Sequence, residues 1–128
     1  MIYVLYTAVI LALVGCDQLL KSWTVHHLAP GESTAFLPGF LQLTRVHNYG
    51  AAWSSFSGKT AMRIAGTSAL RIAVAYLLIR RIVRHPLGVA AAVLILGGGV
   101  GNIIDRIVHG YVVDMFDLLL FDYPVFNL

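Results

Sequence analysis

The sequence LGVAAAVLILGGGVGNII, residues 87–104, decides the fold class of this chain. It contains no charged side chain, and a run of this length and composition is typical of a helix that crosses a lipid bilayer. Four of its five glycines are close together, Gly97, Gly98, Gly99 and Gly101, and they allow a neighbouring helix to approach closely. The stretch therefore predicts a membrane-spanning helix packed against another helix.

Two further segments, residues 3–23 and 60–79, are apolar and have the length of about 20 residues that a membrane-spanning helix needs. The first reaches this length only if it includes Asp17 and Lys21, which lie one turn apart on one face. The second is interrupted by Arg63 and Arg71. The sequence identifies no partner for Arg71.

The composition agrees with a membrane protein. Hydrophobic residues make up 59% of the 128 residues and charged residues 12%, and the mean hydropathy is +0.80. A soluble domain of this size could not hide so much apolar surface from water. The net charge of +3 is concentrated at Arg80, Arg81, Arg84 and His85, between two apolar segments, and so indicates membrane topology rather than nucleic-acid binding. We predict a single all-α integral membrane domain over residues 1–128.

Orientation follows from this basic loop, because positively charged loops stay in the cytoplasm. The N-terminus is then inside, and both the loop 24–59 and the segment 105–128 lie on the outer face. Within the loop, residues 40–46 alternate between apolar and polar, as a half-buried strand does, and a turn at residues 48–50 precedes a second short strand around residues 52–56. We therefore expect a small β-sheet on the outer membrane surface.

Four polar groups interrupt the apolar pattern, and all fall on the predicted outer side: Asp17 with Lys21, residues 47–52, residues 101–106 and residues 112–117. Carboxylates close to hydrocarbon are candidates for function. Asp114 follows Tyr111, Val112 and Val113, which should remove water from its carboxyl group and raise its pKa. Two such carboxylates that share a proton can act as an acid and base pair. Asp114 is therefore the leading catalytic candidate.

Each polar group also has a plainer interpretation. Asp17 and Lys21 would serve equally as an ion pair at a helix end, and Asn102, Asp105 and Arg106 as a cap for the third span. Asp117 and Asp122 are interpreted as solvated surface charges. His26, His27 and His47 lack the spacing of metal ligands, so no metal site is predicted.

Two whole-chain alternatives remain open. Residues 13–16, Leu-Val-Gly-Cys, resemble the cleavage site of a lipoprotein precursor, but Met1 to Tyr6 carry no basic residue and further spans follow. The single cysteine, Cys16, is instead predicted to be an apolar core residue, and it excludes an intrachain disulfide. The second alternative is a non-enzymatic, transporter-type subunit with Asp17, Arg71 and Asp105 as a relay. It predicts polar residues at all membrane depths.

Short motifs in order along the chain point to a family. They are Asp17-Gln-Leu-Leu-Lys21, Asn48-Tyr-Gly-Ala-Ala-Trp-Ser54, Gly98-Gly-Val-Gly-Asn-Ile-Ile-Asp-Arg106, Gly110-Tyr-Val-Val-Asp114 and the incomplete Phe126-Asn127-Leu128. Together they resemble the motifs of bacterial lipoprotein signal peptidase, or signal peptidase II. The resemblance implies an aspartic endopeptidase without metal or other cofactor, which cuts diacylglyceryl-modified prolipoproteins just before the lipidated cysteine.

The resemblance also implies site residues and a setting. Asp114 corresponds to one catalytic aspartate, and supporting or substrate-binding roles fall on Asp17, Lys21, Asn48, Gly50, Asn102, Asp105, Arg106 and Asn127. The implied partners are lipid-modified prolipoproteins and membrane lipid, for a monomer in the bacterial cytoplasmic (inner) membrane. The family's second catalytic aspartate would lie three residues after Asn127 and be followed by a fourth span. We therefore expect a C-terminally truncated fragment that is inactive by itself.

Overall fold

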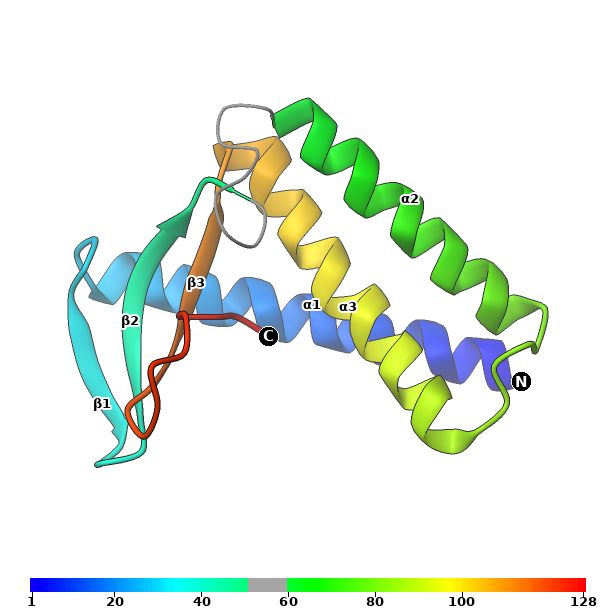
Figure 1. The fold of residues 1–128 in the computed structure, drawn as a ribbon, viewed down its shortest axis with the longest axis horizontal. Coiled ribbons are helices and arrows are strands. Elements are labelled where there is room, and N and C mark those ends of the chain that lie inside the picture. The colour runs from blue at the N-terminus through cyan, green and yellow to red at the C-terminus, as the bar shows by residue number, and fades with distance from the viewer. Residues whose placement is uncertain (51–59) are drawn as a thin grey trace.

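The computed structural model describes residues 1–50 and 60–128 (Figure 1). The elements are the helices α1 (Ile2–His27), α2 (Thr60–Ile79) and α3 (Pro86–His109) and the strands β1 (Ser33–Leu37), β2 (Leu41–Asn48) and β3 (Val112–Leu118). All three helices are long and apolar enough to cross a membrane. This confirms the predicted fold class, a helical membrane protein with a small sheet.

The helix α3 is bounded by clear local signals. The His85 side chain accepts a hydrogen bond from the backbone N–H of Leu87, and Pro86 occupies the first turn, where its missing N–H costs nothing. The helix continues past the predicted end at residue 104 because Asp105 and Arg106 face protein rather than lipid. It ends where Gly110 adopts a left-handed conformation with φ of 80°.

The helix α1 also extends further than predicted, from residue 23 to His27. The His26 and His27 rings reach back to the carbonyl oxygens of Ser22 and Trp23, at 2.7 and 2.8 Å. The His27 ring also stacks on the Trp23 ring. These contacts within the last turn stabilise it beyond the purely apolar segment.

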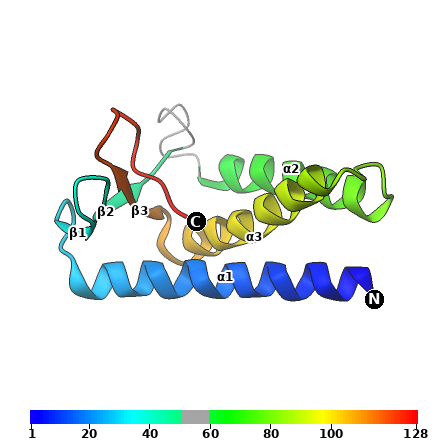
Figure 2. The same ribbon diagram turned by 90° about the horizontal axis from the view of Figure 1, so that it is seen from below.

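The helix α3 is the centre of the bundle and contacts both α1 and α2. Figure 2 shows α1 along one side of the molecule and the other two helices on the opposite side. A methyl group at Gly97 would lie 2.8 Å from the Leu13 side chain, so the glycine is what permits this crossing. The predicted close approach at the glycine-rich stretch is therefore confirmed.

The three strands form one antiparallel sheet in the order β1-β2-β3. The strand predicted at residues 40–46 is present as β2, whereas β1 and β3 were not predicted as strands. The first residues of β3 are buried on both faces, so they lack the alternation that reveals a half-buried strand. The second strand predicted around residues 52–56 lies outside the described residues.

A small apolar core joins the sheet to α1. Met115 has no exposed surface and packs with Leu28 and Leu43, and its sulfur accepts a hydrogen bond from Thr24 Oγ1 at 3.7 Å. The prediction that Cys16 is a core residue was wrong. Its thiol is exposed on the surface of α1 because the next residue, Asp17, occupies the face toward α3.

Candidate active site

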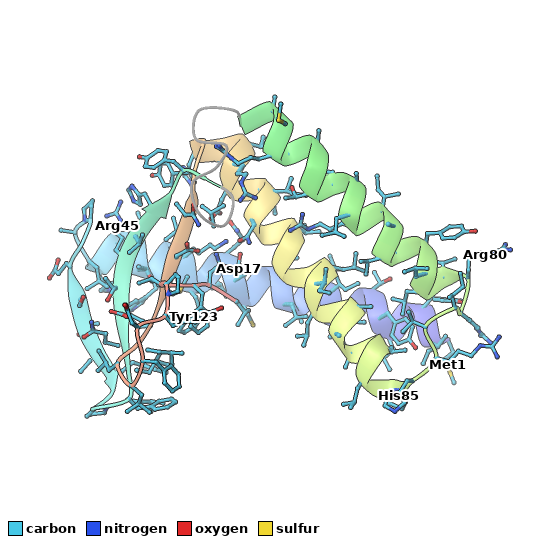
Figure 3. All side chains as sticks on the ribbon, in the orientation of Figure 1. Met1, Asp17, Arg45, Arg80, His85 and Tyr123 are labelled. Carbon is cyan, nitrogen blue, oxygen red and sulfur yellow. The ribbon has the colours of Figure 1, made fainter. Side chains whose placement is uncertain are left out.

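The predicted polar groups come together where α1, α3 and β3 meet, around the position of Asp17 in Figure 3. Lys21 lies at the centre of this cluster. Its Nζ is 2.8 Å from Asp17 Oδ2 and 3.0 Å from Asp105 Oδ2, and it donates to Asn102 Oδ1 at 3.0 Å. Lys21 and both carboxylates are almost fully buried. One ammonium group thus links two helices through two carboxylates and an amide, which we call the Lys21 cluster.

Gln18 completes the Lys21 cluster, although sequence reasoning did not single it out. Its side-chain amide donates to Asp17 Oδ2 and to Asp105 Oδ1, both at 3.2 Å, and to the carbonyl oxygen of Gly101 at 3.3 Å. Gly101 is the position that admits Asp17, because a methyl group there would lie 2.0 Å from Asp17 Oδ2. The signal in the sequence was that Gln18 is itself part of the first motif, although no role was assigned to it.

Asp105 connects the Lys21 cluster to the sheet. The backbone N–H of Val113 donates to Asp105 Oδ2 at 3.0 Å, in a buried contact. The left-handed Gly110 lets the chain turn from α3 into β3 between these two residues. This bond therefore fixes the start of β3 and, with it, the neighbouring residue Asp114.

The Asp114 side chain is 5% exposed, and neutral amides hold both of its oxygens. Asn48 donates to Oδ2 at 3.1 Å and Asn127 donates to Oδ1 at 2.5 Å. Burial raises the pKa of the Asp114 carboxyl, and the two amide hydrogen bonds oppose this shift. The direction agrees with the expectation from its apolar neighbours. A buried, oriented carboxyl group with a raised pKa can accept and return a proton during catalysis.

The two amides come from opposite sides of Asp114. Asn48 ends β2, in which Val46 pairs with Asp114, and its own Oδ1 accepts the N–H of Gly50 at 3.0 Å. Asn127 follows Phe126, whose carbonyl oxygen accepts hydrogen bonds from both Met115 and Phe116. Segments that are far apart in sequence therefore converge on one carboxylate.

Arginines lie on the α2 side of α3. Arg71 Nη1 donates to the carbonyl oxygen of Thr67 at 2.7 Å, and a methyl group at Gly99 would overlap its guanidinium. Arg71 therefore has a partner on its own helix and a space on α3, neither of which the sequence could identify. Arg63 and Arg106 are also buried. Of the three arginines, only Arg106 lies in a sequence motif and was predicted as a site residue.

Two surface predictions have different outcomes. Asp122 is exposed, as expected. Asp117 is not simply solvated, because its Oδ2 accepts hydrogen bonds from Gln42 at 2.7 Å and Thr44 at 3.1 Å on the adjacent strand.

In residues 1–50 and 60–128, no group of three or more His, Cys, Asp or Glu side chains is arranged to hold a metal ion.

Residues 9–128 match the family described as signal peptidase (SPase) II. This chain belongs to the signal peptidase II family. A lipoprotein signal peptidase of Enterococcus faecalis is 39% identical over 97% of this chain and 77% of its own length. Another, from Lactiplantibacillus plantarum, is 40% identical over 96% of this chain and 82% of its own length.

Solved structures agree with the family assignment. A bacterial membrane enzyme determined by the in meso method at 2.3 Å resolution superimposes with a TM-score of 0.85 and 33% identity, over 95% of this chain and 76% of that one. A second such structure, at 1.9 Å resolution, gives a TM-score of 0.80 and 32% identity over 95% and 80% of the two chains. The family is one of membrane aspartic proteases, so the chain is a multi-pass membrane protein of an enzyme family.

Proposed function

We propose that the protein removes signal peptides from diacylglyceryl-modified prolipoproteins, just before the lipidated cysteine, with Asp114 as a catalytic carboxylate. Membership of the signal peptidase II family supports the reaction and the substrate class. The observation that supports the residue is the cradle of Asn48 and Asn127, which fixes both oxygens of a buried carboxyl group. Such a group is oriented before the substrate arrives.

The chemistry is hydrolysis of one peptide bond by an aspartyl pair. One ionised carboxylate takes a proton from water, whose oxygen attacks the carbonyl carbon that precedes the lipidated cysteine. The other carboxyl group, protonated, gives its proton as the bond breaks and the amine of the cysteine leaves. Asp114 is one member of this pair. By resemblance to the family, the second member is the residue three positions after Asn127.

The remaining motif residues act by positioning. The Lys21 cluster holds α1 against α3, and its Asp105 holds the backbone of Val113 beside Asp114. Asn48 and Asn127 orient the Asp114 carboxyl group, and Gly50 supports Asn48. Arg106 is buried at the end of α3, directly after Asp105, and supports this arrangement. We propose that the working unit is a monomer.

The proposed setting is the bacterial cytoplasmic (inner) membrane, with the N-terminus inside and the site at the outer face. The support is the separation of charges along the bundle. Arg80 and His85 lie at one end with Met1, whereas Asp17 and the sheet lie toward the other (Figure 3). Positively charged loops face the cytoplasm. At the outer boundary, acyl chains of the substrate would remain in the lipid while its peptide meets the sheet.

A transporter-type role is disfavoured by the same geometry. A relay through Asp17, Arg71 and Asp105 requires groups at separate membrane depths. Asp17 and Asp105 instead share one ammonium group, that of Lys21, and Arg71 bonds to its own helix.

The proposal is tested with Asp114→Asn, and Asp122→Asn serves as a matched control because Asp122 is exposed. Each protein is expressed from its gene, together with any codons that follow the one for Leu128. Cleavage of a purified prolipoprotein with a diacylglyceryl cysteine is followed in liposomes by gel mobility. We expect Asp114→Asn to lose activity by about 10²-fold or more. Full activity in that variant, or equal cleavage of an unmodified precursor, would refute the assignment.

A further inference from the structure

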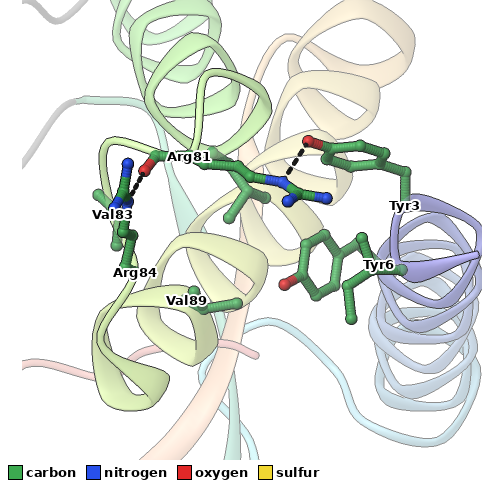
Figure 4. A pocket seen from close by; sticks show the side chains of 8 residues that line it. Tyr3, Tyr6, Arg81, Val83, Arg84 and Val89 are labelled. Carbon is green, nitrogen blue, oxygen red and sulfur yellow. Dashed lines mark hydrogen bonds between the residues drawn. The ribbon is translucent and has the colours of Figure 1, made fainter.

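A cavity of about 570 Å³ lies at the end of the helix bundle away from Asp114 (Figure 4). It is formed by the first turns of α1, the end of α2, the loop 80–85 and the start of α3. Its volume is within the range of roughly 300–1,000 Å³ that is typical of small-molecule sites. None of the residues that line it belongs to the candidate active site.

One part of the cavity wall is hydrocarbon. It is provided by Ile2, Leu78, Val83 and Val89. Leu78 is buried in the apolar core that it forms with α3, and Val89 packs against that core. Packing therefore restricts the movement of these side chains. The opening lies at the ends of three membrane-length helices. The wall is therefore accessible from the boundary where acyl chains meet their head groups.

The other part of the wall is polar and cationic. Arg81 Nε donates to the Tyr3 hydroxyl oxygen at 3.4 Å, and this hydroxyl donates to the carbonyl oxygen of Ile79 at 2.9 Å. Arg84 Nε donates to the carbonyl oxygen of Arg81 at 2.9 Å. Both guanidinium groups are thus held through Nε. Among the described residues, neither has a hydrogen-bond partner for its two terminal nitrogens.

No carboxylate of this chain can neutralise these arginines. The sequence holds six acidic residues, and none of them falls within residues 1–16 or 60–104, the segments that form this end of the bundle. The Arg81 backbone has a φ of 55° and closes the end of α2, which directs the loop back over the cavity. The cavity therefore combines an apolar wall with two exposed, unneutralised guanidinium groups, of which that of Arg81 extends toward Tyr3 and that of Arg84 lies on the other side of the loop (Figure 4).

We propose that this cavity binds one anionic phospholipid of the leaflet that faces the loop between α2 and α3. The phosphate accepts hydrogen bonds from the terminal nitrogens of Arg81, as guanidinium groups favour, and Arg84 adds positive charge at the rim. The upper part of one acyl chain lies along Ile2, Leu78 and Val89. Basic pockets between membrane helices are suited to such head groups. The site is independent of the proposed peptidase activity.

The test measures binding of phosphatidylglycerol to the full chain in detergent micelles by native mass spectrometry. We expect Arg84→Gln to weaken the dissociation constant about fivefold, and the pair Arg81→Gln with Arg84→Gln about 25-fold, from the usual contribution of a basic residue near anionic lipid. Arg80→Gln is the matched control, because Arg80 lies in the same loop and does not line the cavity. Its affinity should match that of the parent chain.

A second variant tests the apolar wall without changing the charge. Val89→Trp fills the cavity and should abolish retention of the lipid, while circular dichroism reports an unchanged helix content. The proposal is overturned if Arg80→Gln weakens binding as much as Arg84→Gln, or if phosphatidylcholine binds equally well. It is also overturned if inorganic phosphate at equal concentration displaces the lipid, since the site would then select a free anion.

Discussion

Substituting alanine for Gly101 places a methyl group in the space that the Asp17 carboxylate occupies. The new carbon would lie 2.0 Å from Asp17 Oδ2 and 2.9 Å from Asp17 Cγ, so the buried side chain must move. Movement breaks the 2.8 Å contact with Lys21 and the hydrogen bond from Gln18. Overpacking costs about 1–3 kcal/mol and a broken buried ion pair about 3–5 kcal/mol. We therefore expect the free energy of unfolding to fall by about 3–5 kcal/mol.

The assay is unfolding of the purified protein by increasing sodium dodecyl sulfate in mixed micelles, followed by circular dichroism. Gly15→Ala and Gly66→Ala are matched controls, because both are helical glycines with no atom within 4 Å of the added carbon. Each control should be neutral or stabilising by up to about 1 kcal/mol, since alanine favours a helix. A Gly101→Ala variant as stable as the controls would refute the role of this glycine in admitting Asp17.

Three further predictions concern the charged groups. Burial raises the pKa of Asp114, so the folded chain retains a proton that the unfolded chain releases above about pH 3.9. The free energy of unfolding should therefore fall as the pH rises from there toward the folded pKa. The Asp114→Asn variant should not show this fall in denaturation experiments. Asn127→Ala removes a hydrogen bond that lowers the same pKa, so the acid limb of the cleavage profile should move to higher pH, and an unmoved limb would exclude this role. Lys21→Met leaves Asp17 and Asp105 buried without their shared cation. In the same detergent titration, this variant should lower the free energy of unfolding by about 3–5 kcal/mol. Arg80→Gln is the control and should leave the free energy of unfolding unchanged.

Local features of the fold could be predicted from the sequence because their causes are local. The spacing of Asp17 and Lys21 places them on one helix face, and their ion pair is present. The glycines of the third span predicted a close helix contact, which Gly97 makes. The strand β2 alternates in polarity and was predicted, whereas β3 is buried on both faces at its start and was not.

Other features depend on contacts between distant parts of the chain. The bond from Val113 to Asp105 depends on how Gly110 redirects the backbone, and the partners of Asp117 depend on the register of β2 and β3. Periodicity contains no information on either. The exposure of Cys16 had a similar origin, because Asp17 and Leu13, one turn earlier, occupy the face of α1 that meets α3. In a membrane chain the most apolar face can be the outer one.

The distribution of polar partners separates structural carboxylates from the one proposed to react. Asp17 and Asp105 share the Lys21 ammonium group. Neutralising either the ammonium group or the carboxylates would leave the remaining charged group unpaired in a buried site. Asp114 is held differently, because its two hydrogen-bond donors are neutral amides and, among the described residues, no cation lies within ion-pair distance of it. Hydrogen bonds from neutral amides favour the ionised carboxylate less strongly than a salt bridge to a cation does. Of the three buried aspartates, Asp114 is therefore the one whose proton can come and go without disrupting the helix packing that positions it.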